Sequence, residues 1–138
     1  MVKADAVYIL DDTAVEALWG LRDGQEVIEQ IFQQAQKQHL EIYLTVIDLG
    51  KAYRRMVREK MKKATQEALE QLEESPVNIV VINKKIALEA MDLVMDYGLD
   101  DSEGFACAMA VITEGTLVTS NPAMESIKDE LDVLWLTE

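Results

Sequence analysis

Acidic, amide and hydroxyl side chains follow four short apolar segments of this sequence, and such oxygen-bearing residues are suited to holding a hard metal cation. These residues are Asp11 and Asp12, Asp48, Asn83, and Ser120 and Asn121. A further carboxylate, Glu103, begins a segment of small apolar residues. The chain has 1 histidine and 1 cysteine, so it lacks the residues for a zinc finger, an internal disulfide or a Ser-His-Asp hydrolase of the usual type. Any catalysis is therefore expected to depend on carboxylates.

The elements that must position these residues can be predicted from hydrophobic periodicity. Five short apolar, β-branched segments predict strands over 6–10, 42–46, 77–82, 116–119 and 133–136. Helical patterns predict a helix from Thr13, a helix ending near residue 39, one long helix over 48–74, helices over 84–97 and 103–113, and a short last helix with Asn121 as its cap and Pro122 at its first position.

This alternation of strands and helices predicts a three-layer α/β/α fold with a five-stranded parallel sheet. Parallel neighbours need crossover connections, and the helices supply them. Ligands of such sheets bind beyond the carboxyl ends of the strands. We therefore expect the polar residues above to gather at one edge of the sheet, with Glu103 projecting toward the same crevice.

Length and composition limit the class of protein. The 138 residues are enough for a single domain over 1–138, and the 49% hydrophobic content is typical of a globular chain. The 13 basic and 26 acidic residues give a net charge of −13. No segment approaches the roughly 20 consecutive apolar residues of a membrane span, and the beginning of the sequence lacks the features of a signal peptide. We therefore expect no membrane association and a cytoplasmic location.

Three segments resemble the PIN-domain family, whose members are metal-dependent ribonucleases and include the VapC-type toxins of toxin–antitoxin pairs. YILDDTAVEAL is similar to the family's opening strand and Asp-Thr-Ser, which places the first family acid on Asp12 and its hydroxyl neighbour on Thr13. YLTVIDLGKAYR is similar to the second segment, with Asp48 where a Glu usually stands. DYGLDDSEGFACAMAVITEGTLVTSNP is the most specific match and places the third acid on Glu103 and the fourth position on Asn121.

The resemblance implies a Mg²⁺- or Mn²⁺-dependent endoribonuclease with catalytic positions Asp12, Asp48, Glu103 and Asn121. It implies hydrolysis of RNA phosphodiesters to a 5′-phosphate and a 3′-hydroxyl, an antitoxin as a possible partner, and a homodimer. Clustered carboxylates repel one another, so a divalent cation would favour their joint ionisation. Asp12, Asp48 and Glu103 are the expected metal ligands, whereas Asn121 offers only a neutral carbonyl oxygen in place of the fourth acid.

Other interpretations remain open at this point. Each acid also lies near a helix start, where a carboxylate can simply cap the helix, and Asn121 before Pro122 favours capping. A PIN-fold module that binds RNA or a protein without cutting is therefore the alternative function. A flavodoxin-like ligand-binding domain is the third possibility, although the sequence has no Gly-rich phosphate loop.

The only strongly basic segment follows Asp48. Seven of the 13 basic residues lie between Lys51 and Lys63. Those at spacings of three and four predict a basic stripe along the long helix: Lys51, Arg54, Arg55, Arg58 and Lys62. The stripe and Thr13 are candidate contacts for RNA phosphates, or the stripe is a solvated helix face. The net charge opposes tight, non-specific binding to nucleic acid and favours a selective RNA.

Overall fold

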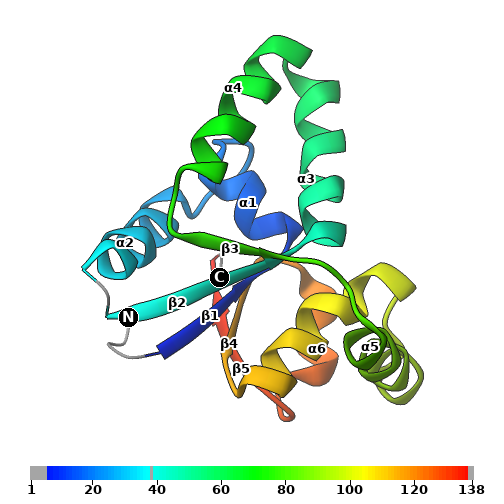
Figure 1. The fold of residues 1–138 in the computed structure, drawn as a ribbon. Helices are drawn as coiled ribbons and strands as arrows, with labels where there is room; N and C mark the ends of the chain where they lie inside the picture. The colour runs from blue at the N-terminus through cyan, green and yellow to red at the C-terminus, as the bar shows by residue number, and fades with distance from the viewer. Residues whose placement is uncertain (1–5, 38, 137–138) are drawn as a thin grey trace.

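A five-stranded, all-parallel sheet with the order β3-β2-β1-β4-β5 forms the centre of the molecule (Figure 1). The computed structural model describes residues 6–37 and 39–136. The strands are β1 (Ala6–Leu10), β2 (Leu40–Thr45), β3 (Val77–Val80), β4 (Thr116–Thr119) and β5 (Asp132–Trp135). The predicted five strands and their parallel arrangement are confirmed, with bounds that shift by one or two residues at some ends.

Helices cover both faces of the sheet, as the predicted three-layer α/β/α fold requires (Figure 1). On one side lie α1 (Asp12–Leu18), α2 (Gln25–Gln36), α3 (Val46–Glu59) and α4 (Lys62–Glu73), and on the other lie α5 (Lys84–Tyr97) and α6 (Gly104–Thr113). Two 3₁₀ helices, η1 (Asp101–Glu103) and η2 (Pro122–Ile127), complete the second side. Successive strand residues point to opposite faces, so Tyr8 and Leu10 join the core under the first four helices while Ile9 joins the other.

The predicted single helix over 48–74 is wrong, because the chain forms two helices that meet at a turn. Lys60 leaves the helical conformation with φ −119 and ψ −150, and Met61, which is 74% exposed, directly precedes α4. A straight helix of that length would extend for about 40 Å. The turn instead brings Leu72 back to the sheet, where it is 2% exposed and joins the core under α1 and α2. The break at Lys60 thus allows this leucine to be buried, which a straight helix over 48–74 would not.

The α5 helix has the predicted bounds, and local signals set both of its ends. The Asn83 side chain accepts a hydrogen bond from the Ile86 amide at its start, and Gly98 ends it in the left-handed region at φ 68. The α6 helix packs closely against α5 at Gly104, where an added Cβ would lie 2.6 Å from the backbone oxygen of Ala90. None of the helices in the described ranges is long and apolar enough to cross a membrane.

Candidate functional site

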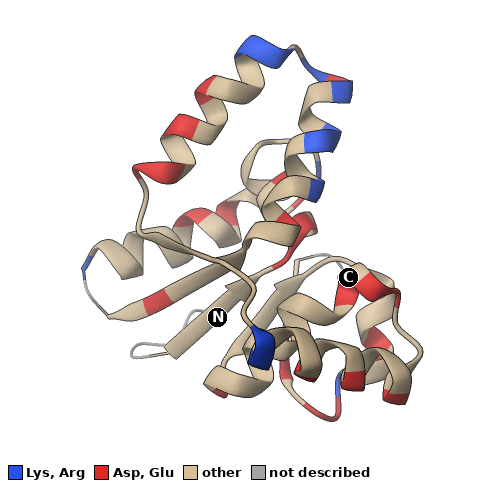
Figure 2. Cartoon of the chain, turned by 45° about the vertical axis from the view of Figure 1, so that its right-hand side comes forward, with Lys and Arg blue, Asp and Glu red and all other residues tan. Residues whose placement is uncertain are grey.

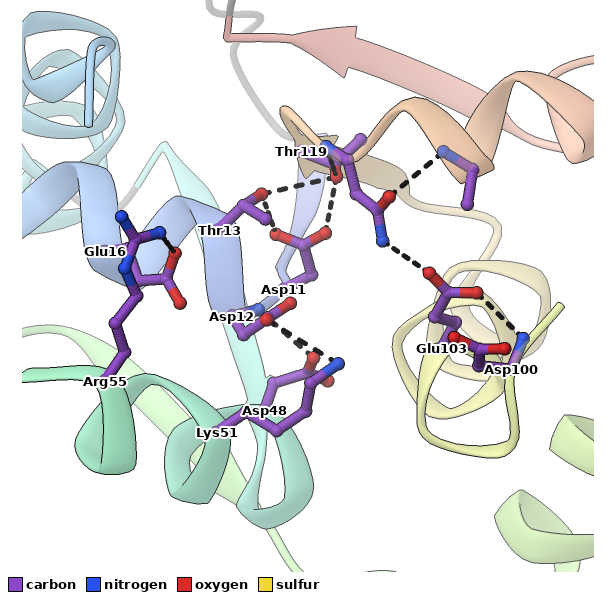
Figure 3. A network of polar contacts seen from close by, with 12 residues as sticks. Asp11, Asp12, Thr13, Glu16, Asp48, Lys51, Arg55, Asp100, Glu103 and Thr119 are labelled. Atoms are coloured by element: carbon purple, nitrogen blue, oxygen red, sulfur yellow. Dashed lines mark hydrogen bonds and ion pairs between the residues drawn. The ribbon is translucent and has the colours of Figure 1, made fainter. Parts of the chain in front are cut away.

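Asp11 is a buried carboxylate at the carboxyl end of the central strand β1 (Figure 3). It caps α1, since its Oδ1 accepts hydrogen bonds from the Ala14 amide at 3.0 Å and from the Thr13 hydroxyl at 2.6 Å. Its Oδ2 accepts a hydrogen bond from the Thr119 hydroxyl at the end of β4. Burial and the neighbouring charge of Asp12 raise the pKa of Asp11 to about 6, although these hydrogen bonds oppose the rise. The ends of two adjacent strands thus fix this carboxylate in place.

Asp48 is the second buried carboxylate, and it lies in the first turn of α3, after β2. Its Oδ2 accepts a hydrogen bond from Thr45 Oγ1 at 2.8 Å, and its Oδ1 accepts one from the backbone amide of Asp12 at 3.1 Å. Its exposed fraction is 2%. Burial first, and then the negative charge of Asp11, raise the pKa of Asp48 to about 8. Asp11 is therefore close enough for its negative charge to disfavour ionisation of Asp48.

Asp12 lies at the more exposed side of this pair. Its carboxylate is 3.6 Å from the ammonium of Lys51, and its side chain is 17% exposed to solvent. The alternative interpretation, in which Asp12 only caps a helix beginning at Thr13, is wrong, because Asp11 is the cap and Asp12 is the first helical residue. Asp12 nevertheless adds to the negative charge, since it raises the pKa of both Asp11 and Asp48.

Glu103 and Asn121 contact each other, and Figure 3 shows Glu103 to the right of Asp11. Glu103 Oε2 accepts a hydrogen bond from Asn121 Nδ2 at 2.7 Å, while its Oε1 accepts one from the Asp100 amide at 2.8 Å. Asn121 also caps η2, as expected, because its Oδ1 accepts a hydrogen bond from the Ala123 amide. The Asn121 amide donates to Thr119 Oγ1 at 2.9 Å, which connects this pair to Asp11. A neutral amide thus stands beside Glu103 where the resemblance implies a fourth acid.

The structure therefore brings the predicted residues to one edge of the sheet but gives the central position to a residue outside the predicted ligand set. That residue is Asp11, and it precedes Asp12 in the Asp-Asp-Thr segment. Two sequence signals point to it: it directly follows the strand, and a threonine stands two residues later to donate to it. Hydrogen bonds connect Glu103 through Asn121 and Thr119 to Asp11, the residue before Asp12, whereas the Asp12 amide donates to Asp48.

The donor set fits a partly hydrated Mg²⁺ or Mn²⁺ better than a cation enclosed by protein ligands. Over residues 6–37 and 39–136, no three His, Cys, Asp or Glu side chains are arranged to hold a metal ion. A carboxylate has about four acceptor positions, of which Asp11 uses three and Asp48 two. Mg²⁺ commonly binds one or two carboxylates and keeps several waters. A divalent charge would also offset the burial and the neighbouring negative charge that together raise the pKa of these two aspartates.

Ion pairs already occupy some of the predicted RNA-binding residues. Lys51 pairs with Asp12, and Arg55 NH1 lies 2.7 Å from Glu16 Oε1. Glu16 is 3% exposed, and the same oxygen pairs with Arg22 Nε at 2.7 Å. These contacts join α1 to α3 one helical turn apart. Two of the stripe's side chains are thus committed to holding α3 in place.

The other five basic residues of segment 51–63 lie on α3 or near the turn between α3 and α4 (Figure 2). They are exposed and form no ion pair with the described part of the chain: Arg54, Arg58, Lys60, Lys62 and Lys63. We call this set the basic turn.

Thr13, the other candidate contact for RNA, has its hydroxyl engaged within the protein, because it donates to Asp11 and accepts from the Ser120 amide at 2.8 Å.

Cys107, the only cysteine, lies in α6 beneath this site and is fully buried, in agreement with a packing role. Its thiol lies 3.4 Å from the sulfur of Met124. Burial raises its pKa to about 12, so the nucleophilic thiolate is not populated at neutral pH.

Comparison with known proteins identifies the fold through solved structures. No family model matches the sequence, and no curated protein matches it. The structure is similar to VapBC2 from Rickettsia felis bound to a fragment of promoter DNA, with a TM-score of 0.69 and 18% identity over 93% of this chain and 97% of that one. DNA-bound VapBC from Salmonella typhimurium gives a TM-score of 0.71 at 8% identity over 96% and 99% of the two chains.

A toxin–antitoxin complex from Klebsiella pneumoniae gives a TM-score of 0.66 at 18% identity, over 95% of this chain and 98% of that one. These similarities extend over nearly the whole chain. The chain therefore has the VapC-type PIN fold that the sequence segments predicted.

Proposed function

We propose that this chain is a PIN-type, Mg²⁺- or Mn²⁺-dependent endoribonuclease that acts as the toxin of a toxin–antitoxin pair. One observation supports this proposal above the others: two buried aspartates, Asp11 and Asp48, lie at the carboxyl edge of a PIN-type sheet, and burial together with neighbouring negative charge raises the pKa of both. Burying two such groups side by side lowers stability unless a cation compensates them. An arrangement of this kind is typical of sites that are completed by a metal.

In this proposal Asp11 and Asp48 hold the metal from the protein side, and Asp12 adds charge at the solvent side. The bound cation would lower the pKa of a water molecule and stabilise negative charge on the phosphate. Thr45, Thr13 and Thr119 donate hydrogen bonds that orient the two carboxylates.

Glu103 can accept a proton or orient water on the other side, where Asn121 holds its Oε2. Because Asn121 carries no charge, the site favours one metal over two.

The basic turn is the proposed contact for the RNA backbone. Arg54 and Arg58 lie one turn apart on α3, the helix that also carries Asp48. Lys60, Lys62 and Lys63 extend the positive charge beyond them, in a chain whose net charge is otherwise strongly negative. We expect Arg54→Glu with Arg58→Glu to weaken RNA binding and to reduce its log–log salt slope by about 0.7 for each phosphate that the variant no longer neutralises.

A protein partner is part of the proposal, because similar structures are VapBC and toxin–antitoxin complexes. A cavity of about 360 Å³ lies between the end of α1, α2 and α4, and Trp19, Phe32 and Leu72 are among its lining residues. Its partly apolar lining suits one face of an antitoxin peptide. In this proposal the protein would encounter RNA and antitoxin in the cytoplasm, and this location remains a prediction.

Cleavage of single-stranded RNA with and without Mg²⁺ or Mn²⁺ tests the proposed activity. We expect metal-dependent cleavage that EDTA abolishes, and we expect Asp11→Asn and Asp48→Asn to remove it. Asp129→Asn is the matched control, since Asp129 is an exposed carboxylate away from the site. Comparing the cleavage rates of Asp11→Asn and Asp12→Asn tests whether cleavage depends more on Asp11, at the centre of the site, or on Asp12, the residue that the sequence favoured. Cleavage that persists in EDTA or in Asp11→Asn would contradict the proposal.

A second candidate function is a PIN-fold module that binds RNA or protein without cutting. The Asn121–Glu103 contact favours it. A neutral amide, Asn121, stands at the position of the fourth acid and donates a hydrogen bond to Glu103, the third acid. RNA binding that is unaffected by metal, with no cleavage under any condition, would support this alternative over the nuclease.

A further inference from the structure

Lys51 places a positive charge against the carboxylates of the candidate site. It lies in α3, three residues after Asp48, and its ammonium is 3.6 Å from Asp12 Oδ2. Figure 3 shows its side chain beside Asp48, with the ammonium directed at Asp12. In the part of the chain that the structure describes, it is the one basic side chain that forms an ion pair with a carboxylate of the site. Burial and Asp11 raise the pKa of Asp48, and the charge of Lys51 is among the influences that oppose this rise.

The contact between Lys51 and Asp12 is one that a stronger cation can replace. Its 3.6 Å separation is longer than a direct hydrogen bond, whereas the neighbouring Arg55 lies 2.7 Å from Glu16. The Lys51 side chain is 24% exposed and has a flexible stem, so its ammonium can move without displacing α3. A divalent cation carries twice the charge of Lys51 and repels it. The lysine and the metal therefore compete for the same negative charge.

The position of Lys51 on α3 also connects the site with the basic turn. Arg54 and Arg58 follow it at spacings of three and four residues, so the three side chains succeed one another along one side of the helix. An RNA backbone that contacts the basic turn would therefore reach the carboxylates at Lys51. An ammonium released from Asp12 is then available to a phosphate oxygen, with which it forms a charge-assisted hydrogen bond.

We propose that Lys51 is a catalytic residue that exchanges partners: it balances the charge of Asp12 in the metal-free protein and contacts the reacting phosphate of the RNA when a divalent cation is bound. This inference rests on the proposed nuclease function. The contribution of Lys51 is electrostatic, because its ammonium stabilises the negative charge that develops on the phosphate. It transfers no proton, so an arginine at this position can supply the same charge.

Calorimetric titration of the full chain with MnCl₂, without RNA, tests the competition. We expect Lys51→Met to bind Mn²⁺ about tenfold more tightly than the wild type, since the variant lacks a positive charge that repels the ion. Lys51→Arg should bind Mn²⁺ as the wild type does. Lys37→Met is the matched control, because it removes the same charge from an exposed lysine that ends α2, before β2 and thus at the other edge of the sheet. Circular dichroism would establish that each variant is folded.

Cleavage of single-stranded RNA at saturating Mn²⁺ tests the contact with the phosphate. Lys51→Met should lower kcat at least about tenfold and change KM by less than about twofold, because an interaction made mainly in the transition state affects turnover rather than binding. Arg54→Glu with Arg58→Glu should instead raise KM. Lys51→Arg should keep most of the wild-type kcat. A merely structural role of Lys51 would not combine tighter metal binding with slower turnover.

Equal Mn²⁺ affinity in Lys51→Met and the wild type, or an equal gain in Lys37→Met, would overturn the competition. An unchanged kcat in Lys51→Met, or a Lys51→Arg variant as slow as Lys51→Met, would overturn the catalytic role. Failure of the proposed function is distinguishable from both. A wild type that binds Mn²⁺ but cuts no RNA contradicts the nuclease, while the Mn²⁺ affinities of Lys51→Met and the wild type still decide the competition.

Discussion

Replacement of Asp48 by asparagine is expected to stabilise the metal-free protein at neutral pH while removing a proposed metal ligand. Asn has nearly the shape of Asp and carries no charge. Its oxygen can still accept the hydrogen bond that the Asp12 amide donates to Oδ1. The change therefore tests the electrostatic cost of this carboxylate with little disturbance of the packing.

The cost follows from the pKa of Asp48, which burial and Asp11 raise from 3.8 to about 8. Below pH 3.8 the group is protonated in both the folded and the unfolded chain, so it costs nothing. Between pH 3.8 and 8 the unfolded chain binds fewer protons than the folded one, so the free energy of unfolding falls as pH rises. At about 1.4 kcal/mol per pH unit, the penalty is less than about 1 kcal/mol at pH 4 and about 4 kcal/mol at pH 7.

The expected net gain of Asp48→Asn at pH 7 is about 3 kcal/mol. The variant has no acceptor for the Thr45 hydroxyl, at a cost of about 1 kcal/mol. For a chain of this length the gain corresponds to a rise of roughly 10 °C in the melting temperature. At pH 4 the two proteins should differ little or the variant should be slightly less stable.

Urea denaturation in EDTA, with each protein at pH 4 and pH 7, measures this difference. EDTA is needed because a bound cation would stabilise the ionised carboxylates of the wild type. Asp129→Asn controls for the removal of one negative charge from a chain of net charge −13. If Asp48→Asn is no more stable than the wild type at pH 7, or if its gain is the same at both pH values, the reasoning from the raised pKa is refuted.

Three further predictions concern the metal and the packing of the helices. Saturating Mg²⁺ or Mn²⁺, at about 100 times its dissociation constant, should stabilise the wild type by about 2.7 kcal/mol, and Asp11→Asn should lack this rise in a thermal shift assay; an equal rise in both would exclude Asp11 as a ligand. Glu16→Gln should destabilise the protein by about 1 to 2 kcal/mol in urea, because it removes the buried partner of the one-third exposed Arg55, and an unchanged midpoint would contradict this role. Gly104→Ala should lower stability by about 1 to 3 kcal/mol, since its Cβ would meet the backbone of Ala90; a variant as stable as the wild type would show that α5 and α6 can separate without cost.

The fold was largely predictable because its signals are local. Asn83 and Gly98 set the bounds of α5 through a side-chain cap and a left-handed residue, and both effects act within a few residues. The β-branched segments and the helical periods between them predicted the parallel sheet, since hydrophobic period and crossover connection leave few other arrangements. Local rules also predicted that the acids and Asn121 would gather at one edge.

The tertiary structure decided which of these side chains are buried together. Adjacent aspartates follow β1, and the local signals for Asp11 become decisive through the packing of β4 beside β1, which brings the hydroxyl of Thr119, a residue 108 positions away, to its carboxylate. The same holds for the break before α4, which depends on the distant core that receives Leu72.

Sequence spacing likewise could not separate the basic residues that bind α1 from those that remain exposed. Lys51 and Arg55 have the same spacing as Arg54 and Arg58, yet Asp12 and Glu16 on α1 pair with the first two. Periodicity and capping depend on neighbours along the chain, whereas burial, ion pairing and pKa depend on neighbours in space. Only the folded chain defines that second set of neighbours.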